Sequence, residues 1–289
     1  IEVSNYKYNS KGGKGKASNI FEIPMPDQFR GKYRGKGAGK KYFIEFEKII
    51  LKAKKANKKI SAMIVEPIIS CGGQIELPEK FLKKCKKILE RENILLIVDE
   101  VQTGFGRVGE KFWGFQLHDV IPDIVTLGKP MGNGHPIGAV VCTAEISKKF
   151  DNGLEFFSSF GGNPVSCRIA NEVIREIDSR NLQKNALKTG KYLISELKKL
   201  AKKYSIIGNV RGRGLFIGLE LVNQNLIPEM DKAIYLVNRM KELGVLMSND
   251  GLDKNVIKIK PPIIFSIDDS KRLIMLLDKV MAEDYMQMN

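Results

Sequence analysis

An acidic residue and a lysine follow two short apolar runs that are typical of buried strands. Asp99 comes directly after the run 94–98, and Lys129 follows the run 124–127 with one glycine between them. In a parallel sheet, loops and helix N-termini gather at the carboxyl ends of the strands, so side chains there can meet a ligand. Position alone is equally compatible with a structural ion pair at the edge of the sheet.

An amine and a carboxylate at this place are suited to chemistry on carbonyl compounds and amines. A desolvated lysine at the sheet edge can supply the neutral amine that attacks carbonyl carbons. Pyridoxal phosphate (PLP) is held as a Schiff base on such a lysine, while an aspartate keeps the pyridine nitrogen protonated. The glycine-rich turn 160–164, which leads into a helix, could present backbone N–H groups to the phosphate.

Other motifs do not indicate a competing cofactor or a metal site. Lys16 is followed by Ala17, so the P-loop rule is not met, and the glycine runs 132–138 and 212–218 are each one residue too long for a dinucleotide fingerprint. The cysteines lie far apart without a Cys-x-x-Cys pair, and there are only two histidines, so neither a disulfide scaffold nor a bound metal is predicted. These residues are Cys71, Cys85, Cys142, Cys167, His118 and His135.

Strands and helices are expected to alternate along most of the chain. The apolar runs favour a mainly parallel α/β sheet whose strands are buried on both faces, followed by a long connecting helix and a smaller α+β domain. We expect domains at 1–60 (the basic, Lys/Gly-rich leading segment), 61–180 (the rest of the large domain) and 181–289. The predicted strands are 61–65, 94–98, 124–127, 137–143, 215–221 and 256–259, and the predicted helices are 79–92, 164–178, 182–204, 229–243 and 267–282.

The composition argues against a membrane span and against a nucleic-acid partner. The 289 residues are 43% hydrophobic and 28% charged, which suits a large folded core, and the absence of an apolar run of about 18 residues argues against a membrane span. Residues 1–60 hold 16 Lys or Arg against 5 Asp or Glu, which accounts for +11 of the net charge of +15. Aromatic residues do not interleave these charges, so a nucleic-acid partner is not predicted.

The chain begins at Ile1 without an initiator methionine, a signal peptide or a transit-peptide pattern. We therefore expect the sequence to be a fragment whose natural start lies elsewhere. A cytoplasmic location is predicted, with a mitochondrial location left open.

Three motifs in a fixed order carry a resemblance to a known family. The runs 98–109, 122–130 and 160–164 resemble those of the class III aminotransferases, which are fold-type I PLP enzymes, and the run 211–215 adds to the match. The resemblance covers nearly the whole chain. It implies a fold-type I PLP-transferase-like architecture and PLP as the cofactor.

The resemblance also implies roles for individual residues. Asp99 matches the partner of the pyridine nitrogen, Gln102 the contact to the ring hydroxyl, and Lys129 the Schiff-base lysine. Glu66 matches an acid near the substrate. Ser159 stands where the family usually has a threonine that reaches the cofactor phosphate of the partner subunit, which implies a homodimer with shared sites.

Two departures from the family pattern bear on the reaction. The family's phosphate-binding loop and its ring-stacking aromatic residue precede the matched region, so the sequence is expected to begin just after them. Lys258 stands where many members have an arginine that grips the substrate carboxylate, and lysine cannot form that bidentate pair. The runs 256–262 and 70–74 most closely resemble those of the ethanolamine-phosphate and phosphohydroxylysine phospholyases.

The sequence therefore predicts an enzyme that binds a primary amine as a PLP aldimine, with Lys129 moving the proton. Amino transfer is the family's usual reaction. Elimination of phosphate from a phosphorylated amine such as phosphoethanolamine is the alternative that Lys258 raises. A second alternative, from a different class, is an inactive fragment or a module that binds anions through its basic segment.

Overall fold

The computed structural model describes residues 2–287. The chain divides into two compact units, Ile1–Ser61 and Ala62–Asn289. The predicted start at Ile1 and the last two residues of the predicted domain 181–289 lie outside the described residues. The predicted boundaries at 60 and 180 remain predictions.

The first unit contains two helices, α1 (Asn5–Tyr8) and α2 (Ala38–Lys55). The Tyr42 hydroxyl on α2 donates to the carbonyl of Asp27 at 2.9 Å and accepts the N–H of Tyr33 at 3.1 Å, which joins the helix to the preceding loop. Lys32 and Lys48 both bond to Glu45 and, by stabilising its charged form, lower the pKa of this carboxyl to about 2. Part of the positive charge of this unit is thus used in surface ion pairs.

The second unit begins with a mainly parallel four-stranded sheet, as predicted. Its strands lie in the order β1, β4, β5, β6, with β1, β4 and β5 parallel and β6 antiparallel to β5. The connection 128–138 contains only a short 3₁₀ helix, whereas a parallel crossover needs about a dozen residues or more, so the chain turns back. The bounds are β1 Ala62–Val65, β4 Leu95–Asp99, β5 Ile124–Leu127, η2 Lys129–Met131 and β6 Ala139–Cys142.

The two faces of this sheet differ in burial. Successive residues of a strand point to opposite faces, and Leu96 and Val98 on one face are fully buried. Ile64 and Leu95 are 43% and 37% exposed, so the prediction of burial on both faces is wrong at these positions. The predicted helix 79–92 forms as α3 (Phe81–Arg91), and its buried residues recur at helical spacing: Phe81, Leu82, Cys85, Ile88 and Leu89. The short hairpin of β2 (Ile68–Ile69) and β3 (Ile75–Glu76) and the helix η1 (Gly114–His118) complete this part.

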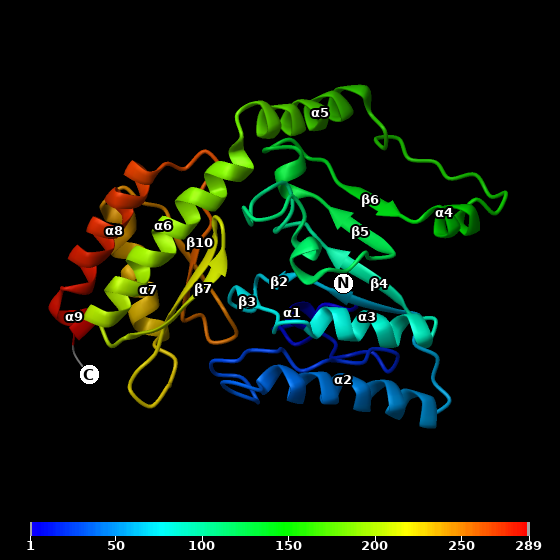
Figure 1. Ribbon diagram of the computed structural model, residues 1–289, viewed down its shortest axis with the longest axis horizontal. Coiled ribbons are helices and arrows are strands. Elements are labelled where there is room, and N and C mark those ends of the chain that lie inside the picture. The colour runs from blue at the N-terminus through cyan, green and yellow to red at the C-terminus, as the bar shows by residue number, and fades with distance from the viewer. Residues whose placement is uncertain (1, 288–289) are drawn as a thin grey trace. The chain divides into compact units, whose positions relative to one another are not determined.

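A second sheet lies in the C-terminal part, and it is entirely antiparallel. Its strand order is β7, β8, β10, β9, and Figure 1 shows α6 leading from α5 to the helices that accompany this sheet. The smaller α+β part predicted after the long helix is therefore present. The bounds are α4 Ala144–Phe150, α5 Pro164–Ser179, α6 Leu182–Lys203, β7 Ile207–Arg213, β8 Phe216–Leu221, α7 Met230–Glu242, β9 Ser248–Asp250, β10 Val256–Ile259, α8 Ile267–Met281 and α9 Asp284–Gln287.

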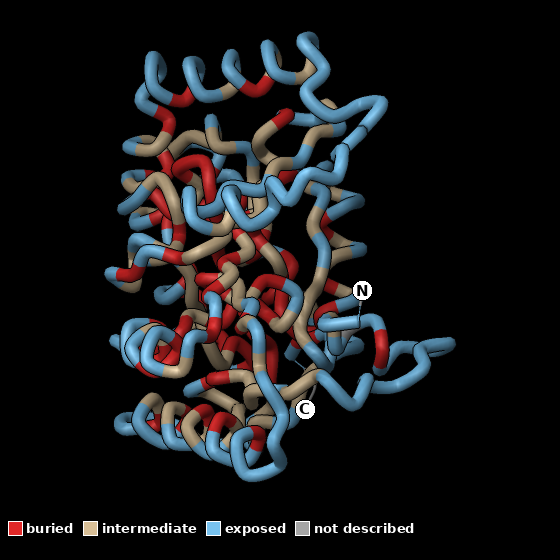
Figure 2. Tube along the Cα trace, turned by 90° about the vertical axis from the view of Figure 1, so that its right-hand side faces the viewer, coloured by how far each residue is buried: buried red, intermediate tan, exposed pale blue. Residues whose placement is uncertain are grey.

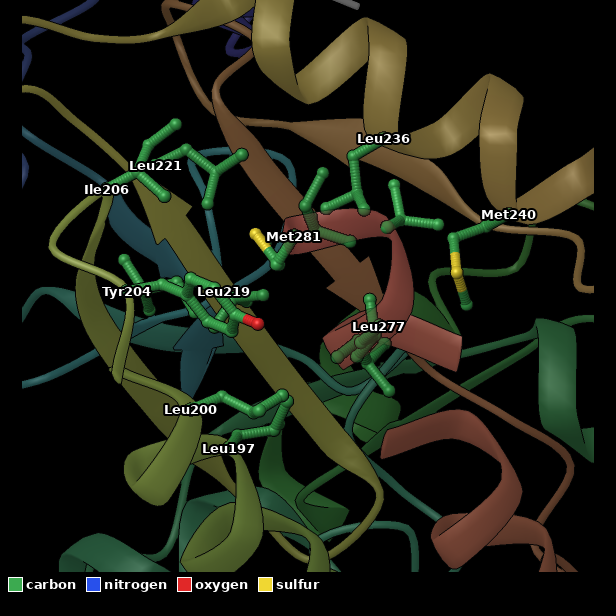
Figure 3. Packing of buried hydrophobic residues seen from close by; sticks show 14 of the residues in the cluster. Leu197, Leu200, Tyr204, Ile206, Leu219, Leu221, Leu236, Met240, Leu277 and Met281 are labelled. Carbon is green, nitrogen blue, oxygen red and sulfur yellow. The ribbon is translucent and has the colours of Figure 1, made fainter. Parts of the chain in front are cut away.

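The C-terminal part has a continuous apolar core. All six residues of β8 are buried, because this inner strand is covered on both faces. Figure 3 shows leucines of α6 and α8 meeting the side chains of β8, with Met240 of α7 beside them. In Figure 2 several helical segments alternate between buried and exposed residues, as amphipathic helices do. Among residues 2–287, no helix combines the length and the apolar character that crossing a membrane requires.

Candidate active site at the carboxyl edge of the parallel sheet

Three predicted site residues lie at the carboxyl ends of three neighbouring strands. Glu66 follows the last residue of β1, Asp99 is the last residue of β4, and Lys129 follows β5 after Gly128. Asp99 is paired in register with Thr126 of β5, three residues before Lys129. Because β1, β4 and β5 are parallel neighbours, the sheet brings these residues to one edge (Figure 1).

The Asp99 carboxylate keeps capacity for a further partner. Its Oδ1 accepts the N–H of Val101 at 3.0 Å, and no other residue within 2–287 forms a hydrogen bond to it. The side chain is half-buried on the more open face of the sheet. It can therefore accept a proton-bearing nitrogen of a ligand without losing its bond to the protein.

Lys129 has an unusual backbone conformation. Its φ is 23°, on the border of the left-handed region, and a non-glycine residue there costs on the order of 1–3 kcal/mol. The residue opens η2, and its side chain is exposed. The desolvation expected from sequence is thus not supplied by the described part of the chain, because Lys129 lies beyond the covered end of β5. The surrounding fold therefore holds the Lys129 backbone in this unfavourable conformation.

Gln102 belongs to a continuous chain of hydrogen bonds. Its Oε1 accepts Nζ of Lys260 at 2.8 Å, and its Nε2 donates to Oγ of Ser70 at 2.8 Å. The Ser70 hydroxyl bonds to Oε1 of Glu66, and the Ser70 N–H donates to Oε2 of Glu66 at 3.0 Å. Two predicted site residues, Glu66 and Gln102, are thereby joined through Ser70, and Lys260 ends the chain.

Glu66 and Lys260, at the two ends of this hydrogen-bond chain, both have shifted pKa values. Burial raises the pKa of Glu66, and the negative charge of Asp99 acts in the same direction. Burial lowers the pKa of Lys260 to about 8 from its ordinary value of 10.5, against the opposing effect of Asp250. The Lys260 ammonium also lies 4.1 Å from the ring centroid of Phe216, within the range of a cation–π contact.

Lys258 lies on β10, two residues before Lys260, which directly follows the end of this strand. Its Nζ pairs with Oδ1 of Asp250 at 3.1 Å, and Nζ of Lys260 is 3.9 Å from Oδ2 of the same carboxylate. Both lysines line a cavity of about 560 Å³, together with Arg272 and Asp269. The described residues thus give Lys258 a carboxylate partner and a place at a cationic cavity wall.

The loop 70–74 is fastened to the second sheet. Gly251 N–H donates to the carbonyl of Cys71 at 3.0 Å, and Nε2 of Gln74 donates to Oδ2 of Asp250 at 2.8 Å. Nε of Arg211 donates to the carbonyl of Gly73 at 2.8 Å. These bonds position Ser70, and through it Glu66 and Gln102, relative to Lys258 and Lys260.

Ser159 is not brought to this site by the described residues. It is exposed in the segment 151–163 between α4 and α5, which Figure 1 shows extending away from the sheet. The neighbouring turn 160–164 leads into α5, and its role as a phosphate cradle remains a prediction. The Asn163 side chain caps α5 and accepts the N–H groups of Val165 and Ser166, which are therefore not free for a ligand.

The sequence motifs indicate no role for Lys260, Ser70 or Asp250. Lys260 does carry a signal, because it lies two residues after Lys258, and residues two apart in an extended segment point to the same side. Asp250 carries no such signal, since its bond to Gln74 joins residues 176 positions apart. Ser70 bonds to Glu66 and Gln102, and its residue type alone does not indicate these contacts.

Known proteins of two activities resemble this chain. It is 43% identical over 284 residues to the alanine–glyoxylate aminotransferase 2-like protein of Drosophila melanogaster, covering 95% of this chain and 58% of that protein. A solved phospholyase from Arthrobacter in complex with phosphoethanolamine matches with a TM-score of 0.87 and 33% identity, covering 92% of this chain and 64% of that one.

A second solved structure is an amine transaminase from an uncultivated Pseudomonas species in its PLP-bound form. It matches with a TM-score of 0.81 and 28% identity over 89% of this chain and 60% of that one. The chain thus spans about three fifths of the length of the proteins it matches. The family model "Aminotransferase class-III" matches residues 3–281. The resemblance seen in the sequence is confirmed, and the chain belongs to the class III aminotransferase family.

Proposed function

We propose that this chain is part of a PLP-dependent enzyme that transfers the amino group of a primary amine. The observation that carries the proposal is the placement of Asp99 and Lys129 at the carboxyl ends of two adjacent parallel strands, with Glu66 at the end of a third. Family membership and the PLP-bound transaminase among similar structures support the same cofactor.

The donor set at this edge fits PLP. Asp99 has an oxygen available for a protonated ring nitrogen, and the exposed amine of Lys129 can bond to an aldehyde carbon. Gln102 retains one N–H that is not used by Ser70. When bound, PLP supplies an electron sink for charge that develops at the carbon beside the amine.

Each side chain has a separate task in this proposal. Lys129 holds the cofactor, and its released amine then accepts and returns the proton of the substrate carbon. Asp99 keeps the ring nitrogen protonated, and Gln102 contacts the ring hydroxyl. Glu66, whose pKa burial raises, lies on the substrate side and is held by Ser70.

Phosphate elimination is the second candidate reaction. Lys258, Lys260 and Arg272 line one cavity, so three cationic side chains can attract a phosphate. The Arthrobacter phospholyase, solved with phosphoethanolamine, supports this alternative. The cavity charge does not by itself exclude a carboxylate substrate, so amino transfer remains the first proposal.

One assay separates the two reactions. The full protein, loaded with PLP, is incubated with alanine and a keto acid, and separately with phosphoethanolamine without a keto acid. Amino transfer produces a new amino acid in the first mixture, whereas elimination releases inorganic phosphate and ammonia in the second. If neither occurs and no cofactor adduct forms on Lys129, the proposal is wrong and the inactive or anion-binding alternative gains support.

We also propose that the protein acts on its small amine substrate as a homodimer. The segment around Ser159 exposes Leu154, Phe156, Phe157 and Phe160, each at least 74% exposed. Exposed aromatic residues at this density are typical of a protein interface. A second copy of the chain would cover them and would bring Ser159 to the neighbouring site, as the family resemblance implies.

Complementation tests the shared site. Lys129→Ala and Ser159→Trp subunits, each inactive alone, are expected to regain partial activity when mixed, because one site of each heterodimer is intact. Subunit exchange is confirmed with distinguishable tags. Exchange without recovered activity would contradict a shared site. The predicted cytoplasmic location, with mitochondria as the alternative, is tested by cell fractionation.

A further inference from the structure

The hydrogen-bond chain from Lys260 to Glu66 has a definite direction. Lys260 donates to the oxygen of the Gln102 amide, and the amide nitrogen donates to Ser70. The Ser70 hydroxyl in turn bonds to Glu66. Within this hydrogen-bond chain, the side-chain oxygen of Gln102 faces Lys260 and its NH₂ group faces Ser70.

Lys260 is the member of this hydrogen-bond chain whose chemistry requires this direction. A lysine ammonium has donors and no acceptor, so the group that meets it must be the amide oxygen. A serine hydroxyl can donate or accept, and a carboxyl that holds its proton can do the same. In the structure the Ser70 hydroxyl donates to Glu66 and accepts the amide N–H of Gln102, so this end agrees with the direction that the Lys260 ammonium requires.

We propose that Lys260 is a positioning residue that fixes the orientation of the Gln102 side-chain amide. The inference rests on the proposed function for its catalytic meaning, because Gln102 is the expected contact to the ring hydroxyl of PLP. With the oxygen bound to Lys260, the amide presents its remaining N–H, on the Ser70 side, as a donor for the ring oxygen. A rotated amide would present an acceptor and repel that oxygen.

Lys260 is held in place from several elements. The Phe216 ring of β8 lies 4.1 Å from its ammonium, and Asp250 of β9 lies 3.9 Å away. Lys258 on β10, and Cys71 and Glu66 from the first part of the unit, also act on its charge. Only 13% of the side chain is exposed, so solvent offers Gln102 little substitute if Lys260 is removed.

A titration of the cofactor spectrum tests the proposal. The visible absorbance band of the PLP–lysine adduct reports the pKa of its proton, which the ring oxygen shares. In Lys260→Met the amide loses the cation that fixes its oxygen, and weakened donation to the ring oxygen should raise this pKa by about 0.5–1 unit. Lys260→Arg keeps a donor-only cation and should restore the wild-type value.

Two control variants separate positioning from simple charge. Lys258→Met removes the same charge two residues away without touching Gln102, and it should shift the pKa much less than Lys260→Met does. In a Gln102→Ala background, Lys260→Met should add almost nothing, because the group through which it acts is gone. An undiminished shift in that background would overturn the proposal.

A second measurement does not depend on the cofactor. The ¹⁵N side-chain resonance of Gln102, assigned from its loss in Gln102→Ala, should be single in the cofactor-free protein and should move or broaden in Lys260→Met. An unchanged resonance would contradict the proposal, even if the protein bound no PLP. Absence of a cofactor band in the wild type, with the expected resonance change, would instead count against the proposed function alone.

Discussion

The two sheets of residues 62–287 differ in burial and in the residues at the ends of their strands. The antiparallel sheet packs against an apolar core, and all residues of β8 are buried. The parallel sheet leaves Ile64 and Leu95 partly exposed and ends in polar residues at its carboxyl edge. We therefore expect the antiparallel sheet to act as rigid support and the parallel sheet to carry the candidate site. Lys258 on β10 and Lys260, which directly follows this strand, connect the antiparallel sheet to that site.

The largest expected effect comes from the parallel sheet. Lys129→Ala should abolish the borohydride-stable PLP adduct and turnover, because no other lysine follows a parallel strand in the matching motif. The adduct is located by mass spectrometry after reduction. A reducible adduct at a different single lysine in this variant would show that the assignment of Lys129 is wrong.

Asp99→Asn should slow turnover by about 10²- to 10³-fold, since an amide cannot keep the ring nitrogen protonated. The free energy of unfolding should change by less than about 0.5 kcal/mol, because one bond to Val101 is retained. Urea unfolding and turnover are measured on the same sample. A normal rate would remove Asp99 from the mechanism.

In the core beside the antiparallel sheet, the expected effect is on the free energy of unfolding. Leu277→Ala creates a cavity in this core and should lower the free energy of unfolding by about 2–5 kcal/mol. Phe157→Ala, in the exposed segment, should change the stability of the monomer by less than about 0.5 kcal/mol but weaken dimerisation. Urea unfolding at several protein concentrations separates the two. Equal losses would contradict the contrast between core and exposed segment.

The next prediction concerns Lys258, which lies on β10 of the antiparallel sheet and lines the cavity. Lys258→Ala removes one cation from the cavity wall and should raise KM for an anionic substrate more than it lowers kcat. Lys254→Ala, a nearby exposed lysine outside the cavity, is the matched control. A loss confined to kcat would place Lys258 in the chemical step instead of substrate binding.

The smallest effect is the pH dependence of stability from Lys260. Its pKa is lowered to about 8, so between pH 8 and 10.5 the unfolded chain binds a proton that the folded chain does not. The free energy of unfolding should therefore rise by about 1 kcal/mol from pH 7 to pH 9 relative to Lys260→Met. Urea unfolding of both proteins at the two pH values measures the difference. A parallel response would show that Lys260 titrates normally.

Sequence patterns predicted the elements that carry the site. The apolar runs placed β4 and β5, and the motifs placed Asp99 and Lys129 directly after them. The long helices α5 and α6 and the strand β10 were predicted within a few residues of their observed bounds. The direction of β6 was not predicted, because strand direction depends on the length of the connection as well as on the apolar run.

What the sequence alone determined is the set of local structures and the family, because both depend on residues that are close together in the chain. The contacts of Lys260 were decided only by the tertiary structure. Gln102 and Lys260 are 158 residues apart, and no periodicity connects them. Burial, which lowers the pKa of Lys260 and raises that of Glu66, is a property of the folded chain. Proton affinities at this site therefore follow from packing, because desolvation exists only once distant segments have come together.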